Sequence, residues 1–392
     1  MKKYDFSLLI KLAIGIIVGI LIGLFAPEVI LRIVATFEGL FSNYLNFVVP
    51  LIIVAFVIPG IADLGGGAQK VLGFSVFMSY FSTVLWGFLA YFASLIIIPS
   101  MFKGVAQAAV GESAAAVAPF FTIEMPPLLN ITSAIILAFI IGIGISVTKA
   151  KTIREVALDL NSIVSMILDK TIIPLLPYFI ASIFAQLAHS GSIGEILKVY
   201  GMAMLFVIVF QIIANLLEFV VAYAYAKPEL SFGTLLRNTI PAWLTGLGTQ
   251  SSAATIPVTM QTAENNHVSK DVRDFFIPLS GTIHFPGSSI AITIFSMAVI
   301  YMNDMTIGFG SIVAFIMLMG VTMVAAPGIP GGAIMAAIGL LQVHFGFNDA
   351  QVALMIALYL AQDSFGTAAS VAGNSALVLI IDKNAQKHAE KA

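Results

Sequence analysis

The sequence has no cysteine and few charged residues. Its 392 residues include 18 Lys and Arg and 20 Asp and Glu, so charged residues make up 10% of the chain and the formal net charge is -2. Without cysteine, the sequence gives no indication of a redox compartment. No basic block extends beyond the Lys2 and Lys3 pair, so nucleic acid is not expected as a partner.

The sequence also lacks the common signatures of enzymes. We find no Ser-His-Asp spacing, no cluster of metal ligands and no phosphate-binding loop. We therefore expect a protein that is not an enzyme and that holds no cofactor.

Hydrophobic residues, by contrast, make up 59% of the chain. A soluble surface cannot be built from so apolar a composition, so the sequence predicts a polytopic membrane protein whose partner is the lipid bilayer. Uncharged stretches of roughly 20 residues mark the expected crossings. Six ordinary spans are predicted near residues 8–26, 44–62, 71–99, 125–148, 163–188 and 199–226.

The N-terminus resembles a signal peptide, because Lys2 and Lys3 precede an apolar run. No small-residue cleavage site follows that run, so we interpret it as a retained first helix. With the N-terminus inside, most Lys and Arg residues are cytoplasmic, and only Arg32, Lys103 and Lys198 face outward. This asymmetry predicts an inner (plasma) membrane protein with both termini in the cytoplasm.

Two charged residues interrupt the ordinary spans. Lys170 lies near the start of its span, and Glu218 lies two turns before Lys227. Long side chains near the ends of a span commonly extend to the interface, so we expect both residues to reach toward one.

Two segments, residues 230–265 and 306–346, each have apolar arms too short to cross a bilayer. Their tips, residues 246–257 and 325–333, are rich in Gly and Pro, and the first is also rich in Ser and Thr. Irregular backbone at membrane depth is tolerated only where protein buries it or where it lines a wet cavity. Both segments are therefore predicted to be re-entrant hairpins around an internal polar site.

Each hairpin is followed by a long helix that is interrupted or polar in its middle, at residues 280–288 and 362–374. A hairpin followed by such a helix, occurring twice from opposite faces, indicates an inverted repeat and a secondary transporter with its site at the midplane. The alternative is that Gly and Pro only kink packed helices.

Asp363 is the most informative single residue, because it lies in the middle of a long stretch without other charges. A carboxylate there is costly unless a cation meets it, and a substrate ammonium group would be a natural partner. Thr367 and Ser370 follow on the same helical face. The alternative is a structural Asp that accepts from the backbone amides of a hairpin tip.

Ser251 and Ser252 stand at the first tip, where the N–H groups of a helix end favour an anionic ligand group such as a substrate carboxylate. They could equally be ordinary hydrogen-bonding groups of a buried turn. The second tip, with Gly328, Pro330 and Gly331, is interpreted as a lid and extracellular gate. A passive turn is the alternative.

His284 lies in the first interrupted helix. Its imidazole could donate a hydrogen bond when neutral or carry a coupling charge when protonated. We favour a buried histidine whose hydrogen bonds are satisfied.

From residue 8 to residue 383 the chain resembles the dicarboxylate/amino-acid:cation symporter family, which has the glutamate-transporter fold. Residues 251–259 resemble the family's first hairpin tip, particularly in its serine/threonine branch, and residues 278–283 resemble the start of its seventh helix. Residues 328–331 resemble the second tip, and residues 362–367 resemble the eighth helix.

The resemblance implies an all-α protein with eight transmembrane helices, two re-entrant hairpins and a homotrimeric assembly. It also implies a static scaffold, roughly residues 1–66 and 125–190. A mobile transport domain, roughly residues 67–100 and 198–385, would carry the substrate as an elevator.

The resemblance further implies roles for single residues. Asp363 would hold the substrate amino group, the serines of the first tip and Ser370 would hold its carboxylate, and Thr367 would line the pocket. The candidate substrate-binding residues are Ser251, Ser252, Thr282, Gly328, Pro330, Gly331, Asp363, Gly366, Thr367 and Ser370.

The chain departs from the family pattern at the positions that select acidic substrates. Members with acidic substrates have arginine where this chain has Gly366. Without that cation a side-chain carboxylate would be unpaired in a low dielectric, so glutamate and aspartate should be poor substrates. Ser370 stands where the family usually has asparagine.

The sodium-binding pattern is altered as well. Where sodium-coupled members read Asn-Met-Asp, this chain reads His284, Phe285 and Pro286, and Asn374 replaces a further aspartate. A hard cation in a bilayer depends on anionic oxygen ligands, so two of three sodium sites are expected to be lost. The third, formed by backbone carbonyl groups, could persist near Thr282, Met323, Val324 and Ala326.

The sequence therefore predicts a carrier for a small neutral amino acid with weak or absent sodium coupling. His284 and Asn374 are candidate coupling residues, and the coupling ion could be sodium or a proton. The alternatives are a sodium-coupled serine/threonine symporter and, more remotely, a gated channel.

Overall fold

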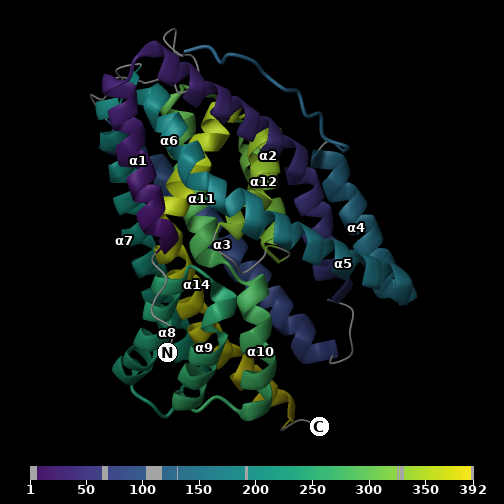
Figure 1. Cartoon of the computed structure of the whole chain (residues 1–392). Coiled ribbons are helices and arrows are strands. Elements are labelled where there is room, and N and C mark those ends of the chain that lie inside the picture. The colour runs from purple at the N-terminus through teal and green to yellow at the C-terminus, as the bar shows by residue number, and fades with distance from the viewer. Residues whose placement is uncertain are drawn as a thin grey trace.

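The computed structural model of the chain describes residues 7–63, 69–102, 117–129, 131–189, 193–324, 326 and 331–389 (Figure 1). Every regular element in these residues is a helix, which confirms the predicted all-helical class. The α-helices are α1 (Ser7–Phe25), α2 (Glu28–Asp63), α3 (Gln69–Met101), α4 (Ile131–Thr148), α5 (Lys151–Ile167), α6 (Ile173–His189), α7 (Ile193–Ala226), α8 (Phe232–Thr249), α9 (Ser252–Asn265), α10 (Lys270–Ile283), α11 (Pro286–Met302), α12 (Phe309–Val324), α13 (Gly332–Phe345) and α14 (Asp349–Ala389).

Many of these helices are apolar enough for a bilayer. Within the described residues, five are also long enough to cross one, and a pair bent by 52° around the α5–α6 junction could form a sixth span. The five spans are Glu28–Ala55, Gly73–Met101, Lys198–Ala226, Lys270–Met302 and Asp349–Lys387. Shorter apolar helices accompany them, so a multi-pass membrane protein is supported, while the count of eight spans stays a prediction.

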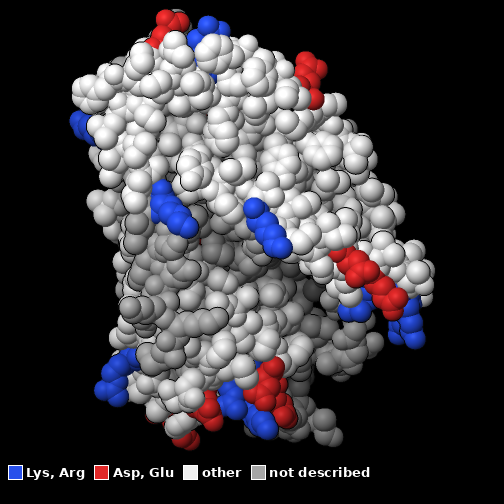
Figure 2. All heavy atoms as spheres, viewed as in Figure 1, with Lys and Arg blue, Asp and Glu red and all other residues white. Residues whose placement is uncertain are grey.

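The surface agrees with this assignment. Figure 2 shows charged side chains at the upper and lower ends of the molecule and at its right edge. Among the described residues, the band between them is largely uncharged on this face, apart from two basic side chains. Such a band suits contact with lipid tails.

Three predicted spans have different boundaries in the structure. The helix expected at 44–62 begins at Glu28, because charged residues in its first turns hid that part of the helix from hydropathy. The span expected at 125–148 begins at Ile131. The span expected at 163–188 is a bent unit in which a five-residue π-helix, Leu168–Ile172, joins α5 to α6.

Small residues bring α1 and α6 into close contact. Gly15, Gly19 and Gly23 lie at four-residue spacing on one face of α1. A methyl carbon added at Gly19 would lie 2.2 Å from the backbone oxygen of Ala181. Glycine is needed here because only a missing side chain lets the two backbones approach so closely.

The helix formed by α10 and α11 is broken at the predicted place. His284 has an extended backbone, and α11 begins at Pro286. Proline lacks an N–H group and disfavours helical geometry at Phe285 before it, yet it suits the first position of a new helix. The break therefore follows directly from Pro286.

Helix α14 occupies the centre of one group of helices and contacts α7, α8, α9, α10 and α11 (Figure 1). Nearly all of its spanning part is buried. Polar residues in the middle of α14 therefore face protein, and they form the centre of the candidate functional site.

Candidate functional site

The carboxylate of Asp363 lies inside the protein, with its side chain on α14 and 3% of the residue exposed. Its Oδ2 accepts a hydrogen bond of 2.7 Å from the backbone N–H of Gly331, just before α13. The Thr367 hydroxyl lies 3.5 Å from Oδ1, and Tyr359 also donates to the carboxylate. No Lys or Arg in the described residues forms an ion pair with Asp363, so its charge has no cationic partner there.

The turn between α8 and α9 touches the same part of α14. Gln250 adopts a left-handed conformation with φ 53°, and its side-chain amide donates to the Ser364 hydroxyl at 2.9 Å. Ser251 caps α9 by accepting from the N–H of Ala254 at 3.2 Å, and Ser252 is buried in the first turn. The first tip thus lies beside Asp363, with the N-terminus of α9 close to it.

The start of α11 also meets this stretch. The N–H of Gly287 donates to the Ser370 hydroxyl at 3.2 Å, and that hydroxyl donates to the carbonyl oxygen of Gly366 at 3.0 Å. A methyl carbon at Gly287 would lie 2.2 Å from the same oxygen, so this contact requires glycine. The turn between α8 and α9, the residue before α13 and the start of α11 therefore all contact α14 between residues 363 and 370.

Other predicted site residues lie elsewhere or outside the described part. Thr282 is exposed and donates to the carbonyl oxygen of Leu279 at 2.8 Å. Met323, Val324 and Ala326 are buried at the end of α12, which leaves the residual sodium site a prediction. Gly328 and Pro330 lie outside the described residues.

Sequence reasoning missed a pair of amides beside Gly366. The Gln211 amide of α7 donates to the carbonyl oxygen of Gly287 at 2.8 Å and to Oε1 of Gln362 at 3.2 Å. Gln211 Oε1 and Gln362 Nε2 are buried and have no partner within the described residues. A methyl carbon at Gly366 would lie 3.2 Å from Gln362 Nε2. Neutral amides therefore surround the position at which the resemblance implies an arginine in members with acidic substrates. A glutamine within an apolar span was the available signal.

The expectation that Glu218 reaches toward an interface is wrong. Its Oε1 accepts from the indole N–H of Trp86 at 2.7 Å and lies 3.2 Å from the Ser82 hydroxyl. Its Oε2 accepts from the Asn215 amide at 3.3 Å. These polar partners hold the carboxyl group between α3, α7 and α14, whereas Lys170 is exposed as expected.

His284 is fully buried, which fits the favoured interpretation. Its Nδ1 lies 2.7 Å from Oδ1 of Asn374 and its Nε2 lies 3.0 Å from the Ser82 hydroxyl. Both ring nitrogens therefore have partners, and Ser82 connects His284 to Glu218. Within the described residues, no three His, Cys, Asp or Glu side chains form a metal-binding cluster.

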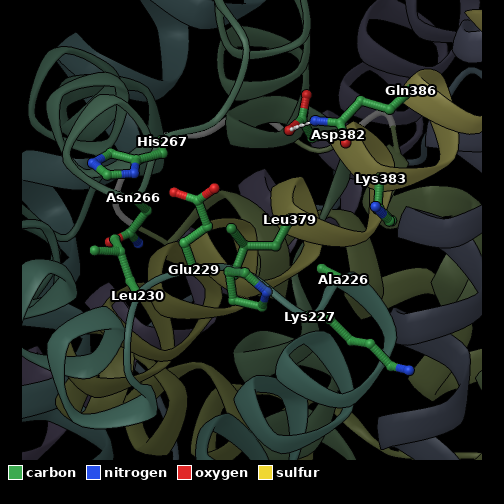
Figure 3. Close-up of a pocket in the computed structure, with 11 residues that line it drawn as sticks. Ala226, Lys227, Glu229, Leu230, Asn266, His267, Leu379, Asp382, Lys383 and Gln386 are labelled. Atoms are coloured by element: carbon green, nitrogen blue, oxygen red, sulfur yellow. Dashed lines mark hydrogen bonds between the residues drawn. The ribbon is translucent and has the colours of Figure 1, made fainter.

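A polar cavity of about 340 Å³ lies at the end of α7 (Figure 3). Glu229, His267, Asp382 and Lys383 are among the residues that surround it. Along α14, Asp382 lies about 28 Å beyond Asp363 at about 1.5 Å per residue, so this cavity is separate from the convergent site.

The structure has apolar spanning helices around a buried polar centre. Two helix pairs and a broken helix meet there at one carboxylate. This arrangement is typical of a polytopic secondary transporter. The model of the sodium:dicarboxylate symporter family matches residues 8–384, and the chain belongs to this family. Its members are transporters rather than enzymes, which confirms the resemblance seen in the sequence.

Similar proteins include several named serine/threonine transporter SstT. The one from Streptococcus suis (strain 05ZYH33) is 25% identical over 347 residues, which covers 84% of this chain and 93% of the relative. The one from Enterococcus faecalis (strain ATCC 700802 / V583) is 25% identical over 345 residues, covering 84% of this chain and 79% of the relative. A third, from Streptococcus thermophilus (strain CNRZ 1066), is 22% identical over 340 residues.

Proposed function

We propose that this secondary transporter carries a small neutral amino acid, with weak or absent coupling to sodium. The observation that supports this most directly is the contrast between Asp363 and Gly366 within one turn of α14. One is a buried carboxylate with no cationic partner in the described residues, and the other is surrounded by neutral amides. The site therefore offers a charge partner to the ammonium group of a substrate but none to a carboxylate on its side chain.

Asp363 would bind the substrate amino group. The N–H of Gly331 occupies one site on Oδ2, while an ionised carboxylate can accept further hydrogen bonds. A charged donor in a buried site forms a short, strong bond to such a group. Since the Gly331 contact also joins Asp363 to α13, substrate binding there would affect the second hairpin directly.

The N-terminus of α9 would bind the substrate carboxylate. Backbone N–H groups of a helix N-terminus favour an anion, and Ser251 and Ser252 begin this helix. Ser370 already bridges Gly287 and Gly366, so we assign it to holding α11 against α14 rather than to direct contact with substrate.

The neutral amides beside Gly366 support a neutral, polar substrate side chain. Gln362 Nε2 is an unpaired donor and Gln211 Oε1 an unpaired acceptor in the described residues. A hydroxyl group can accept from the first and donate to the second. Serine and threonine, which appear in the names of the SstT relatives, carry such a group.

Weak sodium coupling is supported by the altered sodium positions. His284 and Asn374 bond to one another, and neither supplies the carboxylate expected of a sodium ligand, while the nearby Glu218 carboxyl group is joined to His284 through Ser82. The alternative within the class is a sodium-coupled serine/threonine symporter, which the family description and the names of the relatives favour. A backbone site near Ala326 would then be the place of the ion.

The elevator motion and the homotrimer are also part of the proposal. Helices α1, α2, α4, α5 and α6 contact one another, while α3, α7, α8, α9, α10 and α11 gather around α14. Two such groups would suit a scaffold and a transport domain, while α12 and α13 contact helices of both groups.

Counterflow in liposomes tests the proposed function. Vesicles containing the purified protein and unlabelled L-serine should accumulate labelled L-serine, and excess L-threonine or L-serine should compete, whereas L-glutamate should not. Flux that does not saturate would indicate a channel. Competition by L-glutamate as strong as by L-serine would contradict the neutral substrate.

A further inference from the structure

We propose that Glu218 is a proton-binding site that is loaded and unloaded during transport, and that it carries a proton in the arrangement described. This inference rests on the proposed function. It concerns a residue that neither the sequence motifs nor the family comparison assigns to the site.

The chain of hydrogen bonds from Asn374 through His284 and Ser82 to Glu218 supports a proton on the carboxyl group. With Oδ1 of Asn374 facing Nδ1 of His284, the bond between them requires a proton on Nδ1. A neutral imidazole then has a lone pair on Nε2, so the Ser82 hydroxyl must donate to it. Ser82 has only one proton to donate.

The remaining bond joins Ser82 to Glu218, with 3.2 Å between Oγ and Oε1. In the proposed arrangement the Ser82 proton is committed to His284, so the carboxyl group supplies the proton of this bond, whereas an ionised Glu218 would accept it from Ser82. Glu218 is then a neutral carboxylic acid that donates to Ser82. Oε1 still accepts from Trp86 as an acid oxygen, and Oε2 accepts from Asn215 as the carbonyl oxygen.

The neutral acid also suits its surroundings. Glu218 lines an apolar groove of about 310 Å³ between α3, α7 and α14, in which Ser82 and Trp86 supply the other polar groups. No described Lys or Arg forms an ion pair with it. A carboxylate without a cation is costly in an apolar, membrane-facing environment, and binding one proton from water removes that cost.

Other titratable groups around α7 are distant or engaged elsewhere. On α3, Tyr80 donates to Met317. Arg237 of α8 and His189 of α6 are exposed, and α11 has no acidic or basic residue. On α14, Asp363 and Asp382 lie about 15 Å along the helix from Gly373, which is next to Glu218.

Asn215 connects the proton site to the substrate helix. Its side-chain amide donates to Oε2 of Glu218 and, at 2.9 Å, to the carbonyl oxygen of Ala369. Ala369 lies between Thr367 and Ser370. Loss of the proton would turn the Ser82 hydroxyl toward the new carboxylate and remove the donor from His284, so proton release would rearrange contacts at the break between α10 and α11 and, through Asn215, on α14.

Infrared difference spectroscopy tests the proton on Glu218 independently of transport. The carbonyl band of a protonated acid should be present at acidic pH, should change on addition of L-serine, and should be missing in Glu218→Gln. The control Glu155→Gln, which changes an exposed acid on α5, should keep it. A wild-type band that responds to neither pH nor L-serine, or one that persists in Glu218→Gln, would overturn the proposal.

A second variant gives a readout that a purely structural role would not affect. Trp86→Phe removes a donor that favours the charged carboxylate, so the band should persist to a pH about one unit higher, a tenfold change in proton concentration. An unchanged midpoint would contradict the assignment of the band to Glu218.

Proton movement is measured in liposomes that contain a pH-sensitive dye. An L-serine gradient should change the internal pH with wild-type protein and with Glu155→Gln, and should not do so with Glu218→Gln. Saturable L-serine counterflow without any pH change in the wild type would overturn proton coupling. Absence of counterflow in the wild type would instead contradict the proposed function, and the infrared band would still report on Glu218.

Discussion

At the scale of single residues, the site is defined by which charges are present and which are missing. Asp363 keeps a carboxylate inside the protein, and Gly366, which has no side chain, lies among neutral amides. The contact between Asp363 and Gly331 matches the structural alternative considered for this residue, and it leaves the charge uncompensated. Asp363 can therefore both hold the hairpin tip and bind a substrate ammonium group. A substitution that removes only the charge tests the second role.

We predict that Asp363→Asn abolishes substrate binding while the fold persists. The amide keeps an oxygen that can accept from Gly331 but loses the charge that balances an ammonium group. Loss of one partner of a buried ion pair costs about 3 to 5 kcal/mol, so affinity should fall by about a hundredfold or more. L-serine titration by isothermal calorimetry measures this, and an affinity within about tenfold of the wild type would contradict the assigned role.

We predict that Gly366→Arg shifts preference toward acidic amino acids, because it restores a charge partner for a side-chain carboxylate. The added side chain must displace the Gln362 amide, which would lie 3.2 Å from its Cβ. Gly366→Ala is the matched control, since it adds the Cβ without the charge. Competition of L-glutamate against L-serine uptake is the readout. If L-glutamate competes as weakly in both variants as in the wild type, the pocket is placed wrongly.

At the scale of elements, helix contacts depend on residues without side chains. Gly19 of α1 lies against the backbone of α6, and Gly287 of α11 lies against the backbone of α14. These contacts fix the positions of neighbouring helices, because an added methyl group would meet backbone atoms that cannot rotate away.

We predict that Gly19→Ala destabilises the protein. Its Cβ would lie 2.2 Å from the Ala181 oxygen, and overpacking of this kind costs about 1 to 3 kcal/mol. Gly144→Ala in α4 is the control, because no atom lies within 4 Å of its Cβ and alanine favours a helix. Thermal unfolding in detergent should show a lower Tm for the first variant only. An equal Tm for both would show that α1 is not held tightly against α6.

The sequence predicts elements well where a local pattern determines them. The break between α10 and α11 follows from Pro286, and the start of α9 follows from its capping residue Ser251. The start of α2 at Glu28 could not be predicted, because charged residues in its first turns lower the local hydropathy. Helix α5 was missed as well, because its strong amphipathic pattern has no long apolar run.

The site could be predicted only in part for the same reason. Asp363 stands out in sequence because no other charge is near it. The positions of Ser82, Glu218 and His284 relative to one another depend on contacts across up to 202 residues, which no local pattern encodes. Glu218 in particular resembles an interfacial residue until α3 is placed beside it.

At the scale of the whole molecule, we propose that the chain combines the family's architecture with an altered set of ion ligands. It belongs to the sodium:dicarboxylate symporter family, and its resemblance to sodium-coupled members implies that Pro286 and Asn374 stand where those members have carboxylates. A coupling ion acts only through its different affinity for the states of the carrier. Loss of its ligands should therefore remove most of the coupling without removing the carrier.

The most direct test is titration of the purified protein with L-serine in sodium and in choline. Coupling free energies are typically about 1 to 3 kcal/mol, so a sodium-coupled carrier would show a gain of up to about a hundredfold. We predict that L-serine binds with Kd values that agree within about fivefold in the two salts, since less than about 1 kcal/mol of coupling should remain. No detectable binding of L-serine in either salt, or a hundredfold gain in sodium, would contradict a neutral amino-acid carrier with weak sodium coupling.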